Sequence, residues 1–305
     1  MIVITGATGR TGGAAARDLL KKSEKLRVVG RDEKKLERLM QNGAEAIVGN
    51  IEDAAVLSKA FDGADAVYLV VPEDTSQQDL RAHQERVTDS FAAAVSSSRV
   101  PYVVALSSIG AQHAEGTGPI VGLRNLEKKL NGISGLNVFY LRPGYFMENL
   151  LLSLAPLYSM GMLPGGLRED LRMPWIATQD IGRYAASRLL ARDFVGSSVQ
   201  ELHGQRDLSM QEAGSIVGRA IDRPEVKYQQ APPAILESSL LQIGLPQKTV
   251  ALLIEMWNGA NSGLVVAQEA RSAKNTTSTA LETFVADVFA PAYQNFAASH
   301  SGQTA

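Results

Sequence analysis

The chain contains no cysteine, which excludes disulfides, thiol nucleophiles and cysteine-ligated metal sites. Histidine is scarce as well: only four occur, and no two of them stand at the spacing typical of a metal site. No apolar run approaches the roughly 18 residues that a membrane-spanning helix needs. The first apolar strand begins at residue 2, which leaves no room for a signal peptide. We therefore expect no metal, no membrane contact and a cytoplasmic location.

Neither sign of charge dominates the sequence. The formal net charge is −2, and charged residues make up 20% of the 305 positions. A chain without a basic excess has no general surface for nucleic acids, so we expect no direct nucleic-acid binding. The length and the 45% hydrophobic content allow one large domain or two small ones with a substantial core.

A glycine-rich turn stands at the very start of the chain. Ile2 to Ile4 is a short β-branched run typical of a buried parallel strand, and residues 14–20 read as a helix. Between them, glycines recur at intervals of three. Such a strand, turn and helix form the phosphate-binding corner of a dinucleotide fold, although a glycine-rich turn also occurs in other α/β proteins. The residues expected to bind the cofactor here are Gly6, Thr8, Gly9, Arg10, Thr11 and Gly12.

Strand-like and helix-like stretches alternate along the first half, which predicts a parallel sheet covered on both faces. The expected strands are 2–4, 26–30, 44–49, 65–71, 100–106 and 138–141, and the expected helices are 14–20, 33–42, 53–61, 76–98 and 120–130. In the second half we expect loops and short helices over 150–175, strands near 200–203 and 226–229, and helices starting at 209 and over 234–242, 247–257 and 277–297. The fold class is therefore α/β: a Rossmann-type doubly wound sheet with a smaller C-terminal α/β subdomain. We place the dinucleotide domain at 1–150 and the substrate or lid subdomain at 151–305, part of which returns to the sheet near 199–203.

The end of the second strand bears on the choice of cofactor. Gly30 is too small to fill the pocket beside the ribose, and Arg31 and Lys35 offer positive charge to a 2′-phosphate. Asp32 could take the ribose of NAD, but we interpret it as the N-cap of the next helix. By the same reasoning Asp180 is expected to cap a helix that begins at Ile181. Solvated surface charges are the alternative for Arg31 and Lys35. We expect NADP(H) to be favoured over NAD(H).

The turn Gly6-Ala-Thr-Gly-Arg-Thr-Gly12 resembles that of atypical short-chain dehydrogenases/reductases, in particular the NmrA-like family. Residues 107–110, 141–150 and 178–182 resemble the same family. The resemblance implies that Asn50 and Ile51 flank the adenine, that Val71 and Pro72 run beneath the ribose, and that Ser107 and Tyr145 also contact the cofactor. For the apolar residues after the fourth strand, packing in the core of the sheet is the alternative.

The usual catalytic pair of short-chain dehydrogenases is missing. No Tyr-x-x-x-Lys occurs, and Pro119 and Leu123 stand where that pair would be. Members of the NmrA-like family without the tyrosine include quinone-type reductases and NADP(H)-sensing regulators without activity. The resemblance therefore implies either an NAD(P)H-dependent oxidoreductase of quinone-reductase type or a non-enzymatic redox sensor with a regulatory protein partner. A reductase for a specific metabolite is a third possibility, because the sequence does not show the shape of the pocket.

A quinone accepts hydride without a strong general acid, so a reductase needs mainly a pocket above the nicotinamide that orients an aromatic acceptor. Phe146, Met147 and the apolar segment 150–163 are candidates for that pocket, with core packing as the alternative. His113 is the only nearby imidazole, and it serves either as a proton source or in a structural hydrogen bond.

Overall fold

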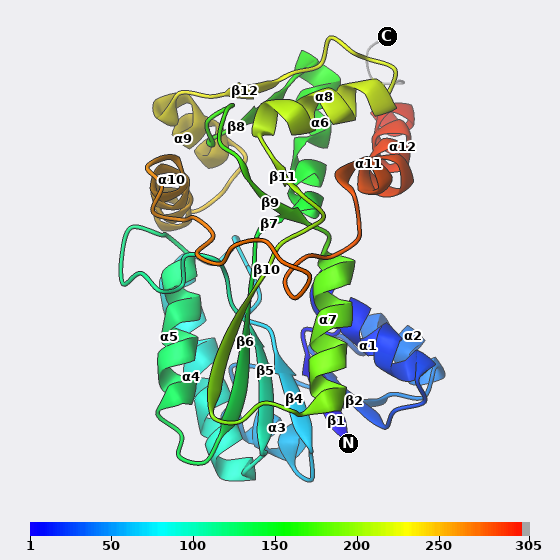
Figure 1. Ribbon diagram of the computed structural model, residues 1–305, viewed down its shortest axis with the longest axis vertical. Helices are drawn as coiled ribbons and strands as arrows, with labels where there is room; N and C mark the ends of the chain where they lie inside the picture. The colour runs from blue at the N-terminus through cyan, green and yellow to red at the C-terminus, as the bar shows by residue number, and fades with distance from the viewer. Residues whose placement is uncertain (301–305) are drawn as a thin grey trace.

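The computed structural model describes residues 1–300. At its centre lies a seven-stranded sheet in which every neighbouring pair of strands is parallel (Figure 1). In spatial order the strands are β3 (Glu45–Val48), β2 (Leu26–Gly30), β1 (Ile2–Thr5), β4 (Ala66–Leu69), β5 (Tyr102–Leu106), β6 (Asn137–Pro143) and β10 (Ser197–Leu202). The strand order reverses between β1 and β4, which is where doubly wound sheets bind ligands. The predicted fold class is confirmed.

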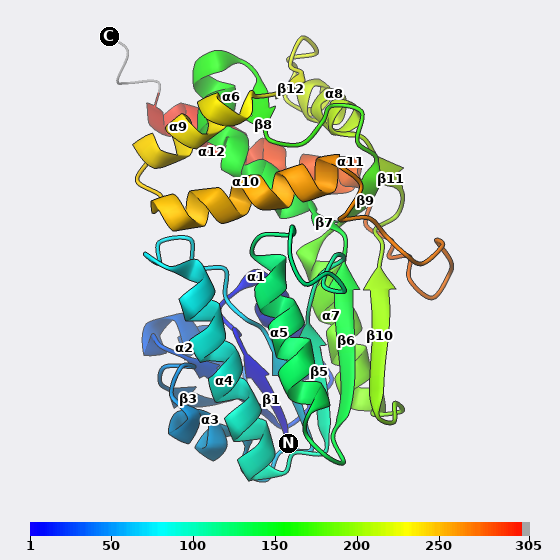
Figure 2. The same cartoon turned by 90° about the vertical axis from the view of Figure 1, so that its left-hand side faces the viewer.

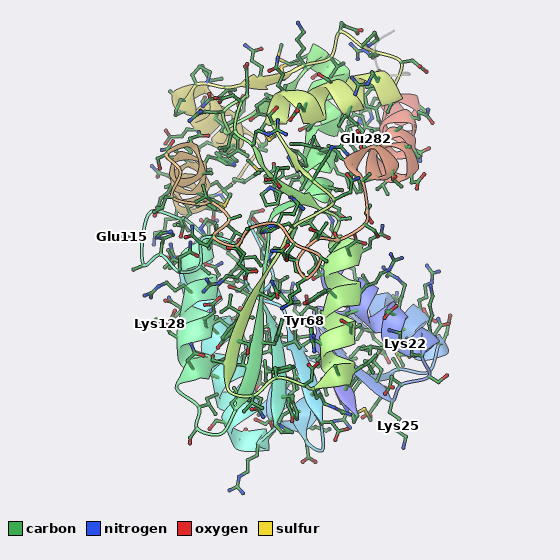
Figure 3. All side chains as sticks on the ribbon, viewed as in Figure 1. Lys22, Lys25, Tyr68, Glu115, Lys128 and Glu282 are labelled. Atoms are coloured by element: carbon green, nitrogen blue, oxygen red, sulfur yellow. The ribbon has the colours of Figure 1, made fainter. Side chains whose placement is uncertain are left out.

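Three helices cover each face of this sheet (Figure 1). One set is α1 (Arg10–Lys21), α2 (Glu33–Gln41) and α7 (Thr178–Ala191); the other is α3 (Ala54–Phe61), α4 (Leu80–Ser98) and α5 (Ile120–Asn131). Alternate residues of β1 serve the two cores, since Ile4 packs with α1 and α7 while Val3 packs with α3 and α4. Tyr68 of β4 is fully buried in this layer (Figure 3).

A second, smaller layer lies beyond the carboxyl ends of the strands (Figure 2). Its elements are β7 (Tyr145–Phe146), η1 (Met147–Ser153), α6 (Leu154–Met160), β8 (Leu163–Gly165), β9 (Met173–Ile176), β11 (Asp207–Leu208), α8 (Met210–Ala220), β12 (Tyr228–Gln230), α9 (Pro233–Gln242), α10 (Gln247–Asn261), α11 (Leu281–Phe284), the π-helical turn η2 (Val285–Phe289) and α12 (Ala290–His300). It has a core of its own around Trp175 and Phe289, both fully buried. Residues 301–305 of the predicted second domain lie outside the described part of the chain.

The chain returns from the smaller layer to the sheet after β9. Helix α7 packs on α1 so closely that a Cβ on Gly182 would lie 2.5 Å from the carbonyl oxygen of Thr11. Strand β10 then pairs with β6, and it covers the strand expected near 200–203. Elements on both sides of position 150 therefore build the sheet.

Helix α10 holds the loops that follow β4 and β5 (Figure 2). Lys248 Nζ donates to Asp79 at 2.6 Å, and Thr249 Oγ1 donates to the carbonyl oxygen of Gln77 at 3.2 Å. The backbone N–H of Gly116 donates to Glu255 at 2.8 Å. The smaller layer thus fixes the loops at the ligand-binding edge of the sheet.

The predicted cap of α7 is wrong. This helix begins at Thr178, and the buried carboxylate of Glu148 accepts the Thr178 N–H at 3.0 and 3.1 Å. Asp180 lies within the first turn and accepts the N–H of Thr279 at 3.1 Å. A carboxylate from a distant segment caps the helix, which local spacing does not reveal.

Two helices start later than expected. Helix α4 begins at Leu80 rather than near 76, because the Asp79 side chain accepts the N–H of Ala82 at 3.0 Å and ends the preceding turn. The last helical stretch begins at 281 rather than 277. Its expected first turn instead runs beside the end of β10, where the N–H of Thr277 donates to the carbonyl oxygen of His203 at 3.0 Å.

Candidate dinucleotide and substrate site

The glycine turn between β1 and α1 is compact. Gly6 has a φ of +65°, a conformation that favours glycine, and its carbonyl oxygen accepts the N–H of Gly9 at 2.9 Å. Helix α1 lies directly against this turn, since a Cβ on Gly12 would be 2.3 Å from the Gly6 oxygen. Any side chain at position 12 would therefore force the helix away from the strand.

The N-terminus of α1 is left open by the residues around it. Gly9 is the N-cap and supplies no side-chain acceptor, and the first turn contains no acidic residue. Thr8, Gly9 and Arg10 are exposed, whereas Thr11 is only 5% exposed. Free N–H groups and the positive end of the helix dipole thus face outward beside an arginine, which is an environment suited to phosphate.

Two cations follow β2, and they differ in their partners. Arg31 is exposed and has no hydrogen bond or ion pair within residues 1–300. Lys35 is also exposed, but its Nζ lies 3.9 Å from Asp32. Asp32 is indeed the N-cap of α2, because its side chain accepts the Lys35 N–H at 3.4 Å. Arg31 is therefore the cation left available for a ligand at this strand end.

The segment after β3 is held by the start of α4. Asn50 is exposed, and its side-chain oxygen accepts the N–H of Glu52 at 3.1 Å, which leaves its NH₂ group pointing away from that bond. The Glu52 carboxylate is bound in turn by His83 at 2.7 Å and by Arg86 at 2.6 Å. Hydrogen bonds from Arg86 and His83 outweigh partial burial and hold the pKa of Glu52 below its usual value. The segment is thus pinned while the Asn50 amide stays available.

Apolar residues stand next to Asn50 and directly after β4. Ile51 is 8% exposed, and Val71 and Pro72, at the end of β4, are partly buried. All three lie on segments that leave the sheet at its carboxyl edge.

The Ser107 hydroxyl is not free. It donates to the Glu127 carboxylate at 2.6 Å, and Glu127 is gripped from the other side by Arg142, whose Nε and Nη2 lie 3.0 and 2.6 Å from the two carboxylate oxygens. Ser107 and Glu127 are 3% and 6% exposed. This buried network joins the ends of β5 and β6 to α5, and it is not among the contacts predicted from the sequence.

Tyr145 lies in β7 of the smaller layer and packs against the core of that layer. Its ring meets Trp175 at 4.8 Å between centroids. Burial, opposed by a hydrogen bond with Asn149, raises the pKa of Tyr145 to about 12. A phenol with this pKa remains protonated at neutral pH, so Tyr145 can donate a hydrogen bond but is a poor substitute for the missing tyrosine of the Tyr-x-x-x-Lys pair.

A carboxylate follows β4. Glu73, just after Pro72, is an exposed residue. Nearby protein atoms nevertheless partly desolvate its carboxylate, and this desolvation raises the pKa of Glu73. The positive charge of Arg10 opposes that shift, and Glu73 in turn adds to the shift of Tyr145. Glu73 thus lies near enough to both Arg10 and Tyr145 for their electrostatic interaction to affect a pKa.

The three expected substrate residues have different surroundings. His113 is half-buried in the loop after β5, and its ring Nε2 lies 3.1 Å from Nε2 of Gln112. Phe146 is partly buried and packs on the sheet core. Met147 is 1% exposed within the core of the smaller layer. Met147 therefore contributes packing, and no open surface of its side chain is left for a substrate.

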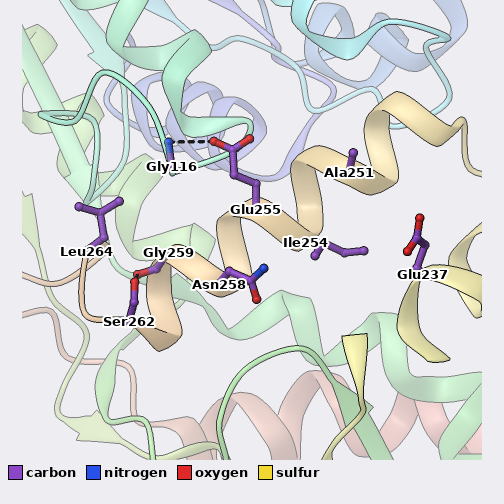
Figure 4. A pocket seen from close by; sticks show the side chains of 9 residues that line it. All are labelled: Gly116, Glu237, Ala251, Ile254, Glu255, Asn258, Gly259, Ser262 and Leu264. Carbon is purple, nitrogen blue, oxygen red and sulfur yellow. Dashed lines mark hydrogen bonds between the residues drawn. The ribbon is translucent and has the colours of Figure 1, made fainter. Parts of the chain in front are cut away.

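A separate hollow of about 630 Å³ lies between α9, α10 and the loop after β5 (Figure 4). Its lining includes Glu237, Ile254 and Asn258, together with Glu255, which accepts the Gly116 N–H. None of the predicted site residues lines it, and we assign no ligand to it. Among residues 1–300 no cluster of acidic and histidine side chains is arranged to hold a metal ion, and no helix has the length and apolar character to cross a membrane.

Known proteins resemble this chain over most of its length. A sequence model of the NmrA-like family matches residues 1–263. NAD(P)H azoreductase from Xenophilus azovorans is 24% identical over 84% of this chain and 86% of its own. Quinone oxidoreductase 2 from Escherichia coli is 27% identical over 86% and 89%. The crystal structure of an Escherichia coli NADPH-dependent quinone oxidoreductase complexed with NADPH superposes with a TM-score of 0.79, at 23% identity, over 95% of this chain and all of that one. The protein belongs to the NmrA-like family of this fold.

Proposed function

We propose that the protein is an NAD(P)H-dependent oxidoreductase that transfers hydride to a quinone-like acceptor. The observation that carries this proposal is the open N-terminus of α1 behind the glycine turn, at the point where the strand order reverses. The azoreductase and quinone oxidoreductase activities named for two relatives support it. A non-enzymatic sensor is the other reading of the same site, and the relatives do not favour it.

The proposal assigns a part of the cofactor to each group of residues. The turn and Arg10 hold the pyrophosphate, Asn50 and Ile51 hold the adenine, and Val71 and Pro72 support the ribose. Residues 1–150 carry these contacts, and the smaller layer, most of which lies within 151–305, covers the acceptor. The Ser107 hydroxyl is already bound to Glu127, so Ser107 contributes to the site by fixing the end of β5 rather than by offering a free hydroxyl to the cofactor.

Bound reduced nicotinamide would supply a hydride, and the protein would supply orientation and exclusion of water. The acceptor gains two electrons with that hydride, and its second hydrogen arrives as a proton from solvent. No residue on α5 takes the place of the tyrosine and lysine, so the acceptor must be reactive enough to need no strong acid. Quinones and azo compounds meet that condition.

The first experiment is a fluorescence titration of the purified protein with NADPH, followed by addition of 1,4-benzoquinone to the same sample. We expect saturable binding and then steady loss of NADPH fluorescence above the rate without protein. Binding without consumption would overturn the reductase proposal and favour the sensor. Absence of binding would overturn the cofactor site itself.

The preference for NADPH over NADH can be tested at Arg31. We propose a preference for NADPH, because Arg31 has no partner among residues 1–300 and can meet a 2′-phosphate. A charge-assisted hydrogen bond contributes about 1.5–3 kcal/mol, so Arg31→Ala is expected to weaken NADPH binding by roughly 10- to 100-fold. Binding of NADH should change little. Arg38→Ala, on the last turn of α2, is the matched control for loss of one positive charge. Equal losses for both cofactors would show that Arg31 has a structural role.

A further inference from the structure

A chain of polar side chains leads from the buried ion pair to the loop after β5. Arg142 binds Glu127 through two of its nitrogens, and its third, Nη1, lies 3.5 Å from Oε1 of Gln112. The Nε2 of Gln112 lies 3.1 Å from Nε2 of His113. The loop is anchored to both layers, since the N–H of Ile109 donates to the carbonyl oxygen of Pro143 at 3.3 Å and Gly116 is held by Glu255.

The donor or acceptor role of each group determines the role of the next group, from Arg142 through Gln112 to His113. Guanidinium nitrogens are donors only, so the Gln112 atom that faces Arg142 must be the amide oxygen. The NH₂ group of Gln112 then faces His113 and can only donate. His113 Nε2 must accept that bond, and a neutral imidazole with an accepting Nε2 carries its proton on Nδ1. No partner within residues 1–300 accepts a bond from Nδ1.

His113 is placed to use this proton. Its ring is half-buried, its Nε2 is engaged by Gln112, and its loop runs between the two layers at the carboxyl edge of the sheet. The same loop carries Glu115, which lies at the outer surface of the molecule (Figure 3). The His113 Nδ1–H thus has no acceptor among residues 1–300 and is free to donate to a ligand.

We infer that His113 is the hydrogen-bond donor for the acceptor in this site: a neutral imidazole, with its tautomer set by Gln112 and Arg142, whose Nδ1–H binds the substrate oxygen or azo nitrogen. The inference rests on the proposed reductase function and deepens it. When hydride reaches a quinone, a carbonyl becomes a hydroquinone oxyanion. The Nδ1–H bond to that oxygen strengthens as its negative charge grows. His113 keeps its proton, because loss from the neutral ring would leave an imidazolate, and water protonates the product oxyanion.

The tautomer can be measured without turnover. In the full-length protein labelled with ¹⁵N-histidine and saturated with NADPH, a ¹H–¹⁵N correlation spectrum distinguishes a protonated ring nitrogen from an unprotonated one. We expect His113 to show protonated Nδ1 and unprotonated Nε2, its signals being identified by their loss in His113→Phe. In Gln112→Glu the neighbouring carboxylate accepts rather than donates, so the proton should move to Nε2. A wild-type spectrum with the proton on Nε2 would overturn the inference.

Kinetics then test the role of the donor. A hydrogen bond to a charged group contributes about 1.5–3 kcal/mol, so His113→Phe is expected to lower kcat with benzoquinone by roughly 10- to 100-fold. NADPH affinity should be unchanged, His113→Asn should recover part of the rate through its amide N–H, and Gln112→Glu should lose rate like His113→Phe. Glu115→Gln is the matched control and should resemble wild type. A His113→Phe enzyme as fast as wild type would overturn the donor role. A wild-type protein without turnover would overturn the proposed function, and the ¹H–¹⁵N spectrum would still test the tautomer of His113 independently.

Discussion

Replacing Gly12 by alanine is expected to abolish NADPH binding and to destabilise the fold. The added Cβ would stand 2.3 Å from the Gly6 oxygen and 3.1 Å from the Thr5 oxygen, both of them backbone atoms. The start of α1 must then move away from β1, and its N–H groups lose the geometry that suits a pyrophosphate. Overpacking of this kind costs about 1–3 kcal/mol of unfolding free energy. NADPH fluorescence titration and thermal unfolding measure the two effects.

A second glycine separates the two consequences. Gly9 is exposed, and a Cβ there would lie 3.2 Å from the Gly6 oxygen, a tight contact but not an impossible one. Gly9→Val is therefore expected to keep most of the thermal stability while its side chain blocks the approach of the phosphates. Normal NADPH affinity in Gly9→Val or in Gly12→Ala would contradict the assignment of this turn.

Replacing Arg142 by methionine is expected to destabilise the fold strongly. Glu127 is only 6% exposed, and the substitution removes the cation that pairs with its carboxylate. The Ser107 hydroxyl is then the remaining side-chain donor to that carboxylate. Removal of one partner from a buried ion pair typically costs about 3–5 kcal/mol. Equilibrium unfolding in urea measures the loss.

The double variant Arg142→Met, Glu127→Gln tests whether the unpaired charge is the cause. The neutral amide still accepts from Ser107, so the double variant should recover much of the stability that Arg142→Met loses. If the two substitutions simply add, the stabilisation by Arg142 comes from packing rather than from the ion pair.

The sequence predicts the sheet well because its signals are local. Strand β2 has the predicted bounds, and Asp32 caps α2 as expected. The capping box of α8, formed by Ser209 and Glu212, is also readable from spacing alone. Each of these features depends on residues within one turn of each other. The cap of α7 failed for the opposite reason, because Glu148 acts across 30 positions.

The candidate site divides in the same way. Its phosphate-binding part is contiguous, so the residues from Gly6 to Gly12 are predictable as a unit. The network of Ser107, Glu127 and Arg142 joins three elements and depends on which side chains meet. One signal was present: a glutamate whose helix otherwise carries an apolar face, together with an arginine at the end of a strand. Buried charges of this kind imply a partner, but the sequence does not identify it.

The return of the chain to the sheet affects how the protein is made. On the ribosome, the first 150 residues appear well before α7 and β10. Until Gly182 and its neighbours emerge, the alanine-rich face of α1 is uncovered, and β6 has an open edge until Ser197–Leu202 pairs with it. The first 150 residues therefore cannot complete their fold as they are synthesised. They need β10, which begins some 50 residues beyond β6, and this pairing is non-local and slow. Until β10 is made, the open edge of β6 exposes the nascent chain to aggregation.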